Sequence, residues 1–325
     1  MTESKVKRIG VLTSGGDAPG MNAAVRAIVR AGISKGYRMM GIQRGYNGLI
    51  DGEVYEMNVR SVSEIIHRGG TILYTARCLE FKTAEGQAKG VARCKELGID
   101  ALVVIGGDGS FMGARALSNL GIPCVGIPGT IDNDIACSEC TIGYDTAMNT
   151  AVEAIDRLRD TTQSHDRCSV VEVMGHHAGY LALNVGIATG AMAVLLPEIP
   201  FDFERDILSR MRKTQITGKK HFIVIVSEGV VNSQELANQI QAATGVDTRA
   251  TILGHIQRGG SPSVRDRVNA SLMGYHAIDL LDKGISNRVV ALSGGQIVDY
   301  DVNVALSMHK TIDRDMLDIA NAISI

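Results

Sequence analysis

Three glycine-rich segments of this chain combine glycines with acidic or hydroxyl side chains. They are TSGGDAPGMNAA at residues 13–24, IGGDGSF at 105–111 and PGTIDND at 128–134. Glycine lets a backbone approach a ligand closely, and the amides that open a following helix can face a phosphate. None of the segments is the G-x-G-x-x-G of dinucleotide binding or a P-loop ending in Gly-Lys-Ser/Thr. Together they indicate phosphate binding, although each alone also fits an ordinary tight turn.

Two of these segments carry carboxylates suited to phosphoryl transfer. Asp108 stands between glycines, where a carboxylate suits Mg²⁺ shared with nucleotide oxygens, and a helix cap is the alternative. Thr130, Asp132 and Asp134 share one face if their segment is extended. A carboxylate there can take the proton from a substrate hydroxyl, and a solvated polar turn is the alternative.

Basic side chains form a second set. Arg77, Arg167 and Arg249 fall in expected loops or strand ends, and GHIQRGGSP at 254–262 adds His255 and Arg258. Arginine binds a phosphate monoester through paired hydrogen bonds. Each arginine alone is more typical of a surface charge, but together with the carboxylates they predict a second, phosphorylated substrate. Glu228, which follows an apolar run, can hydrogen-bond a sugar hydroxyl.

The elements that position these residues alternate between short apolar runs and longer amphipathic ones. The 325 residues fit two domains, and strands flanked by helices predict parallel sheets covered on both faces. We therefore expect an α/β fold of two doubly wound, Rossmann-like domains with mainly parallel sheets, in which ligands bind at the carboxyl ends of strands. The expected strands are 9–12, 38–43, 101–105, 124–127, 169–173, 193–196 and 222–226, and the expected helices are 22–35, 86–97, 111–119, 146–161, 179–188, 204–213, 234–243 and 264–281.

Composition excludes several classes of protein. Hydrophobic residues are 45%, charged residues 21% and net charge −2, which does not favour a nucleic-acid binder. The start, MTESKVKRIGVL, lacks the apolar run of a signal peptide, and no apolar stretch reaches about 18 residues, so we expect no membrane span and a cytoplasmic protein. Cys137 and Cys140 form a lone C-x-x-C, which favours two loop thiols over a redox pair or a zinc site.

Five segments in register resemble a known family. TSGGDAPGMNAA, IGGDGS, PGTIDND, EVMG and GHIQRGGSP occur in this order in 6-phosphofructokinases, and the resemblance to the bacterial ATP-dependent family runs from about Lys7 to beyond Asp282. It implies transfer of the γ-phosphoryl group of ATP to the 1-hydroxyl of fructose 6-phosphate with Mg²⁺. It also implies a homotetramer, with an ATP-binding domain at 1–141 and 257–307 and a fructose 6-phosphate-binding domain at 142–256 and 308–325.

The resemblance also assigns residues to roles. It makes Asp132 the catalytic base, supported by Thr130, Asp134 and Arg77, and makes Asp108 the Mg²⁺ ligand. The implied ATP site consists of Gly16, Arg77, Cys78, Gly107, Asp108, Gly109 and Ser110. The implied sugar-phosphate site consists of Thr130, Asp132, Arg167, Met174, Gly175, His176, Glu228, Arg249, His255 and Arg258, with Arg167 and Arg249 donated by a neighbouring subunit.

Some positions bear on the donor and on substrate affinity. Relatives that use pyrophosphate usually carry Asp where Gly109 stands and Lys where Gly129 stands, so the two glycines favour ATP. His176 replaces the usual Arg, and an unperturbed imidazole is mostly uncharged near neutral pH. A pyrophosphate-dependent phosphofructokinase remains the first alternative. A non-catalytic sugar-phosphate or nucleotide-binding regulator is the second.

A regulatory site is implied as well. In bacterial relatives it takes a nucleoside diphosphate activator such as ADP or the inhibitor phosphoenolpyruvate. Val59 stands where Arg is usual, with Arg60 one residue out of register, and Met192 stands where a metal-binding Glu is usual. We therefore expect weak or altered effector control. The matching basic residues are Arg26, Arg30, Arg159, Lys219, Lys220 and His221.

Overall fold

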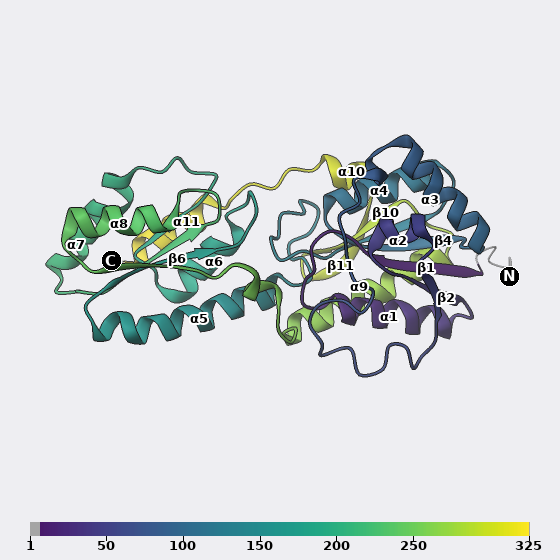
Figure 1. Cartoon of the computed structure of the whole chain (residues 1–325), viewed down its shortest axis with the longest axis horizontal. Coiled ribbons are helices and arrows are strands. Elements are labelled where there is room, and N and C mark those ends of the chain that lie inside the picture. The colour runs from purple at the N-terminus through teal and green to yellow at the C-terminus, as the bar shows by residue number, and fades with distance from the viewer. Residues whose placement is uncertain (1–6, 325) are drawn as a thin grey trace. The chain divides into compact units, whose positions relative to one another are not determined.

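The computed structural model describes residues 7–324, which fold into two compact units (Figure 1). The larger unit contains residues 7–131, Ile135–Thr146 and Arg258–Lys310. The smaller unit contains Asp132–Asp134, Ala147–Gln257 and residues 311–324. Residues 1–6, part of the stretch in which we found no signal peptide, and Ile325 lie outside the described residues.

Within the described residues, the larger unit has a seven-stranded sheet in the order β11-β10-β5-β4-β1-β2-β3. The five inner strands, β10, β5, β4, β1 and β2, pair in parallel, and only the edge strands β3 and β11 run antiparallel to their neighbours. The bounds are β1 Arg8–Thr13, β2 Arg38–Ile42, β3 Val54–Met57, β4 Ala101–Gly106, β5 Cys124–Pro128, β10 Arg288–Ser293 and β11 Gln296–Asp301.

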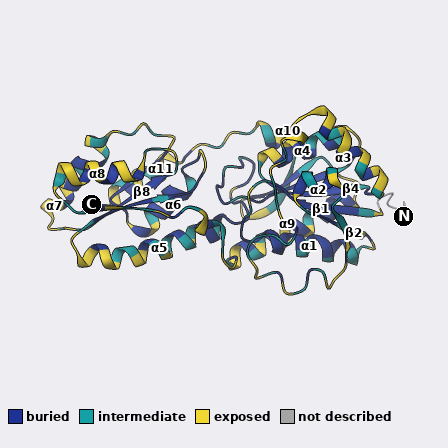
Figure 2. Cartoon of the chain, viewed as in Figure 1, coloured by how far each residue is buried: buried dark blue, intermediate teal, exposed yellow. Residues whose placement is uncertain are grey.

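Helices cover both faces of this sheet, which is why its central strands are continuous apolar runs. All residues of β4 and β5 are buried. Figure 2 shows dark blue in the middle of the larger unit, around the labels β1 and β4. On one face, α2 (Gly45–Asp51), α3 (Ala84–Leu97) and α4 (Asp108–Asn119) pack over Leu12, Leu102 and Val104. The remaining helices are α1 (Met21–Ser34) and α9 (Val264–Asp282), which pack against each other, and α10 (Val302–Ser307).

The smaller unit has a sheet in the order β7-β8-β6-β9, with every pair parallel. Its strands are β6 Cys168–Val173, β7 Ala193–Leu195, β8 Phe222–Ser227 and β9 Thr248–Ile252. Its helices are α5 Tyr144–Ser164, which begins in the larger unit, α6 Tyr180–Thr189, a π-helical turn at Glu204–Leu208 that continues into α7 Ser209–Ile216, α8 Ser233–Thr244, a 3-10 segment at Gly254–Arg258 and α11 Arg314–Ile323.

The fold class expected from the sequence is confirmed, and each predicted strand and helix is present within a few residues of its expected bounds. The sequence reading missed α2, the four strands β3, β9, β10 and β11, and the helices α10 and α11. The edge strand β11 reads QIVDYD and β9 reads TRATI, so charged side chains interrupt the apolar pattern that identifies a strand. No described helix is long and apolar enough to cross a bilayer.

Candidate active site

The three glycine-rich segments meet at the carboxyl ends of β1, β4 and β5, which are neighbours in the larger sheet. The Ser14 amide donates to the carbonyl of Ile105 at 2.9 Å, and the Gly129 amide donates to the carbonyl of Gly106 at 3.0 Å. The Ser110 hydroxyl donates to the carbonyl of Ser14 at 3.1 Å. The structure thus joins the segments that sequence spacing had only placed in separate loops.

Glycine occurs at two positions of this cluster for different physical reasons. A Cβ on Gly106 would lie 2.4 Å from the Ser110 hydroxyl and 2.5 Å from the Ser14 carbonyl, so packing requires glycine there. At Gly109 a Cβ would meet no atom within 4 Å, because this glycine faces open space at the start of α4. Asp108 beside it is exposed in the first turn of α4. The helix amides and an exposed carboxylate together suit a phosphate with its cation.

A second loop lies along the first glycine-rich segment. The Thr75 hydroxyl donates to the carbonyl of Gly15 at 3.0 Å, and the Gly15 amide donates to the carbonyl of Ala76 at 3.5 Å. These bonds bring Arg77 and Cys78 next to the glycine-rich segment, as their predicted shared role requires.

Asn22, which sequence reasoning missed, holds the loop that leads to Arg77 through hydrogen bonds to its backbone. Its buried amide donates to the carbonyls of Arg68 and Gly69, both at 3.1 Å, and its Oδ1 accepts from the Ile72 amide at 2.8 Å. The signal was present, since a polar residue at the buried start of α1 needs partners.

Arg258 also contacts the first segment, within the larger unit. Its Nη1 donates to the carbonyl of Asp17 at 3.4 Å, and a Cβ on Gly16 would lie 2.1 Å from the same nitrogen. The guanidinium therefore occupies the space that the missing side chain of Gly16 leaves. An arginine expected to bind sugar phosphate lies against a loop expected to bind ATP.

The argument that put Thr130, Asp132 and Asp134 on one face is wrong in its geometry. Asn133 has φ 53°, in the left-handed region, so the segment is not extended and side chains do not alternate regularly through it. Asp132 is nonetheless buried, with 8% of its surface exposed.

A buried carboxylate fixes the backbone that follows the Thr130–Asp134 segment in the chain. Asp266, with none of its surface exposed, accepts from the Gly143 amide at 2.9 Å and from the Thr146 amide and hydroxyl at 2.8 and 2.5 Å. Burial raises the pKa of Asp266, while these three hydrogen bonds act in the opposite direction. The backbone fixed in this way also holds the Thr130–Asp134 segment, because the Thr141 hydroxyl donates to the carbonyl of Thr130 at 2.6 Å. Nothing in the sequence pointed to this burial, since the context Arg-Asp-Arg is typical of an exposed helix face.

In the smaller unit, the expected sugar contacts gather at the carboxyl ends of β6 and β8. Glu228 Oε1 accepts from the amides of His176 at 2.6 Å and Gly175 at 3.2 Å. Gly175 has φ 151°, and a Cβ there would lie 2.4 Å from the Ala178 carbonyl. The Met174 amide donates at 2.9 Å to Gln257 Oε1, a fully buried side chain that sequence reasoning missed. His176 is exposed, and His255 is exposed in the 3-10 segment beyond β9.

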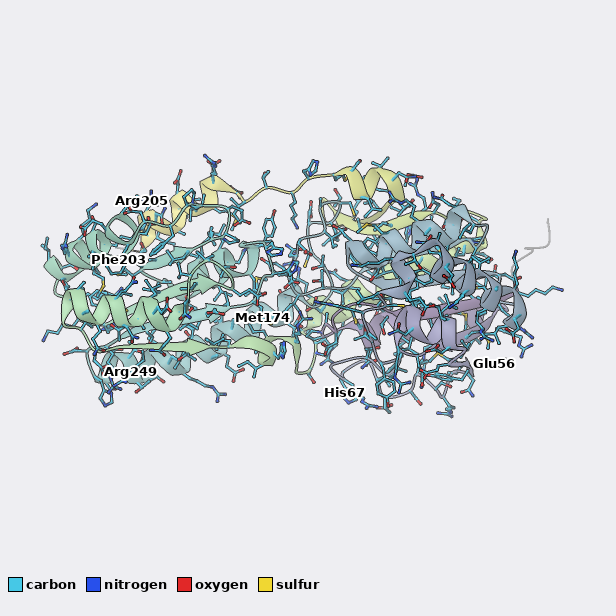
Figure 3. The ribbon with its side chains drawn as sticks, turned by 45° about the horizontal axis from the view of Figure 1, so that its top comes forward. Glu56, His67, Met174, Phe203, Arg205 and Arg249 are labelled. Atoms are coloured by element: carbon cyan, nitrogen blue, oxygen red, sulfur yellow. The ribbon has the colours of Figure 1, made fainter. Side chains whose placement is uncertain are left out.

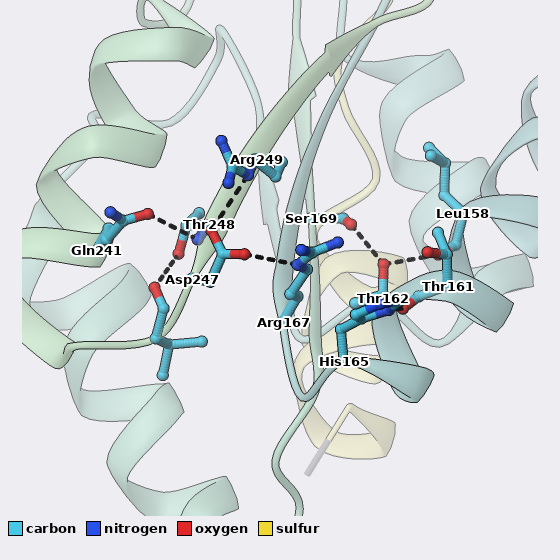
Figure 4. A network of polar contacts seen from close by, with 11 residues as sticks. Leu158, Thr161, Thr162, His165, Arg167, Ser169, Gln241, Asp247, Thr248 and Arg249 are labelled. Atoms are coloured by element: carbon cyan, nitrogen blue, oxygen red, sulfur yellow. Dashed lines mark hydrogen bonds and ion pairs between the residues drawn. The ribbon is translucent and has the colours of Figure 1, made fainter.

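Arg167 and Arg249 lie at the other end of the same sheet. Arg167 precedes β6 and Arg249 is the second residue of β9. Arg167 donates a hydrogen bond to Asp247, and Arg249 forms an ion pair with the same carboxylate (Figure 4). Figure 3 labels Met174 and Arg249 toward opposite ends of this unit. Six residues of β6 separate the two ends, a length of about 20 Å at roughly 3.3 Å per residue. One chain does not bring these arginines together with Glu228.

The expected effector residues fall in both units. Arg26 and Arg30 lie on α1, and Arg159, Lys219, Lys220 and His221 lie in the smaller unit. Burial and then the positive charge of Arg159 lower the pKa of Lys219. Burial, followed by the charges of Lys219 and Arg159, lowers the pKa of His221. These basic groups therefore repel one another, as groups that share an anion do. Met192 is 1% exposed in the core of the smaller unit, whereas Val59 is 41% exposed.

The C-x-x-C thiols are both buried. Burial raises the pKa of Cys137 and of Cys140 to about 11, which keeps them in the unreactive thiol form near neutral pH. Cys78 is only half-buried, and burial raises its pKa as well.

The family model described as Phosphofructokinase matches residues 8–281, most of the chain. This chain belongs to the phosphofructokinase family. The ATP-dependent 6-phosphofructokinase of Clostridium botulinum (strain Loch Maree / Type A3) is 54% identical over 319 residues, which are 98% of this chain and 100% of that protein. The ATP-dependent 6-phosphofructokinase 1 of Clostridium perfringens (strain 13 / Type A) has the same identity and coverage.

Solved phosphofructokinases share the fold. The Saccharomyces cerevisiae structure matches with a TM-score of 0.85 and 34% identity over 98% of this chain, which spans 46% of the yeast chain. The pyrophosphate-dependent phosphofructokinase from Marinobacter aquaeolei matches with a TM-score of 0.85 at 21% identity, covering 97% of this chain and 91% of its own. At that identity the second likeness shows the shared fold alone.

Replacing Asp266 tests the buried support. We expect Asp266→Ala to lower the free energy of unfolding by about 3–5 kcal/mol, because it leaves two amides and a hydroxyl without their buried acceptor. Urea denaturation measures the loss. The matched control is Asp301→Ala, which removes a partly exposed acceptor of two amides at the start of α10 and costs about 1 kcal/mol. Equal losses in the two variants would contradict the assignment.

Proposed function

We propose that this chain is an ATP-dependent 6-phosphofructokinase of glycolysis, which transfers the γ-phosphoryl group of ATP to the 1-hydroxyl of fructose 6-phosphate. The products are ADP and fructose 1,6-bisphosphate. The observation that carries the proposal is the 54% identity over the full length of the clostridial ATP-dependent 6-phosphofructokinases. The joined loops of the larger unit give it a physical basis. We place the reaction in the cytoplasm.

The nucleotide binds to the glycine-rich loops of the larger unit. Amides at the start of α4 face its phosphates, and Arg77 adds positive charge from the neighbouring loop. Gly109 leaves the room that the nucleotide occupies. The proposed ATP-binding residues are Gly16, Arg77, Cys78, Gly107, Asp108, Gly109 and Ser110.

Magnesium fits the donors at this place. Among residues 7–324 no group of three or more His, Cys, Asp or Glu side chains could hold a metal ion. The exposed carboxylate of Asp108 is one suitable ligand, and Mg²⁺ commonly binds one or two carboxylates with water and nucleotide oxygens as its other ligands. Held by Asp108, Mg²⁺ would supply positive charge that offsets the negative charge of the nucleotide phosphates.

Asp132 is the proposed base. It accepts the proton of the 1-hydroxyl as that oxygen attacks the γ-phosphorus of ATP. Thr130 and Asp134 support the segment around it, and Arg77 stabilises charge on the phosphoryl group. A non-catalytic regulator has no use for a buried carboxylate beside such a segment, and this argument weighs against that alternative.

The sugar binds at the carboxyl end of the smaller sheet, against Met174, Gly175 and Glu228. Glu228 is oriented by two amides, so one carboxylate oxygen is fixed and the other can accept from a sugar hydroxyl. His176, His255 and Arg258 are the other proposed substrate contacts of this chain.

Arg167 and Arg249 serve the site of a second copy. They lie at the amino end of the sheet, opposite the end that carries Glu228, so a sugar phosphate held by one chain's Glu228 is out of their reach. A homotetramer in which each site takes these two arginines from its neighbour resolves the conflict.

Gly109 is a cleaner indicator of the donor than Gly129. A side chain at Gly109 would enter open space that a nucleotide can use. A Cβ at Gly129 would lie 2.9 Å from Ile105 Cγ2 and 3.2 Å from Met21 Cε, so packing alone requires glycine there. ATP is therefore the proposed donor, and pyrophosphate remains the alternative to be tested.

A coupled assay tests the function. With Mg²⁺ and fructose 6-phosphate we expect turnover with ATP and negligible turnover with pyrophosphate. We expect Asp132→Asn to lower kcat by about 10²–10⁴-fold, since it removes the base while keeping the shape.

The matched control is Asp301→Asn, which preserves a helix cap and should keep full activity. Turnover with pyrophosphate and none with ATP would reverse the choice of donor. A folded Asp132→Asn variant that retains more than about a third of wild-type turnover would remove Asp132 from its role.

Mixing inactive variants tests the shared site. We expect hybrids of Asp132→Asn and Arg249→Ala subunits to regain activity, because some sites then combine an intact base with an intact arginine. A mixture of Asp132→Asn with Glu228→Ala should gain nothing, since both residues serve one site from one chain. A fully active monomer in sedimentation would contradict the proposal.

We also propose weak control by ADP or phosphoenolpyruvate at the basic effector residues. We expect millimolar ADP or phosphoenolpyruvate to shift the fructose 6-phosphate saturation curve only slightly. The missing arginine contact at Val59 costs about 1.5–3 kcal/mol, as much as a typical allosteric coupling. Val59→Arg should strengthen the response, whereas Met192→Glu would bury a carboxylate in the core and confuse the result. A large shift at micromolar effector in the wild type would contradict this.

A further inference from the structure

One carboxylate holds both arginines at the amino end of the smaller sheet. Asp247 Oδ2 accepts from Arg167 Nε at 2.6 Å, and Asp247 Oδ1 pairs with Arg249 Nε at 3.1 Å (Figure 4). The strands bring the three residues together, because β6 and β9 pair in parallel with Cys168 opposite Thr248.

The backbone around Asp247 is fixed on both sides. Its carbonyl accepts from the Cys168 amide at 3.0 Å. The next amide, of Thr248, donates at 3.1 Å to Gln241 Oε1 on α8, and the Thr248 hydroxyl donates at 2.9 Å to the carbonyl of Val246. The carboxylate therefore projects from a rigid point, and the two long side chains that it binds are the flexible partners.

Both arginines use their Nε to reach Asp247. Each guanidinium carries further donors on its two Nη nitrogens, and no hydrogen bond from those nitrogens to a described residue is found for Arg167 or Arg249. The outer edges of the two guanidinium groups are thus available to an oxyanion. A phosphate monoester matches such edges through paired hydrogen bonds.

Asp247 has two opposing effects on the binding of a phosphate: its negative charge weakens binding, and its ordering of the two arginines strengthens it. Two positive charges and one negative charge leave a net attraction for a phosphate, but the carboxylate itself repels it. The side chains of Arg167, Asp247 and Arg249 are 32%, 37% and 70% exposed, so water screens that repulsion. Orienting the two arginine side chains before binding lowers the entropic cost of immobilising them on the phosphate, and screening by water does not change this gain.

We infer that Asp247 is a positioning residue that makes Arg167 and Arg249 one preformed clamp for the phosphate of a sugar phosphate held by a second copy of the chain. The inference rests on the proposed function, because the phosphate belongs to the substrate named there. Asp247 touches neither the substrate nor the reacting atoms, and it acts only through the two arginines.

The test is a mutant cycle on steady-state kinetics. We expect Asp247→Ala to raise the KM for fructose 6-phosphate about three- to tenfold, with kcat and the KM for ATP nearly unchanged. Asp247→Asn keeps one acceptor, so its KM for fructose 6-phosphate should lie between those of the wild type and Asp247→Ala. In an Arg167→Ala, Arg249→Ala background, the same Asp247→Ala change should leave the KM unchanged or lower it, because only the repulsion is then removed.

The control is Asp206→Ala, which breaks an arginine pair with Arg205 elsewhere in the smaller unit and should not alter the KM for fructose 6-phosphate. An equal rise in KM with and without the arginines would overturn the inference, as would a loss confined to kcat. Affinity for inorganic phosphate, measured by calorimetry, separates the two proposals. If fructose 6-phosphate is not a substrate, the proposed function fails, yet weaker phosphate binding by Asp247→Ala would still support the clamp and unchanged binding would overturn it.

Discussion

Parallel strands impose the constraint on which both units depend. In a parallel sheet every carboxyl end lies at one edge and every amino end at the other. The larger sheet therefore collects three glycine-rich segments at a single edge, after β1, β4 and β5. The smaller sheet separates Glu228 from Arg249 by the length of a strand. The same rule brings three segments together in the larger unit and keeps Glu228 apart from Arg249 in the smaller one, and this separation underlies the proposal of a site shared with a second copy.

Buried polar groups hold the exposed ones in place. Asn22 fixes the loop that carries Arg77, and Asp266 fixes the segment behind Thr130. Both satisfy several backbone groups at once, which a buried polar side chain must do to avoid a large desolvation cost. Residues with proposed chemical roles, such as Asp108, remain accessible because buried neighbours restrain the backbone around them.

The amino end of the smaller sheet is governed by charge. Lys219 and His221 have lowered pKa values because burial and neighbouring cations disfavour another positive charge. Arg167 and Arg249 are arranged differently, because Asp247 lies between them and offsets their repulsion.

The sequence by itself determined the fold class and most central strands, because buried parallel strands are apolar runs. It predicted the residue types of the proposed site, because phosphate loops need glycine. It missed the edge strands β3, β9 and β11, of which β9 has Arg249 interrupting its apolar run, and it also missed β10, which lies between β11 and β5. It did not anticipate the left-handed φ of Asn133, which no alternation rule predicts. Only the tertiary structure decided that Asp266 is buried and that Asp247 joins two arginines, since both depend on which distant segments become neighbours. Local patterns record what a residue can do, and the packing of remote strands and helices decides what it meets.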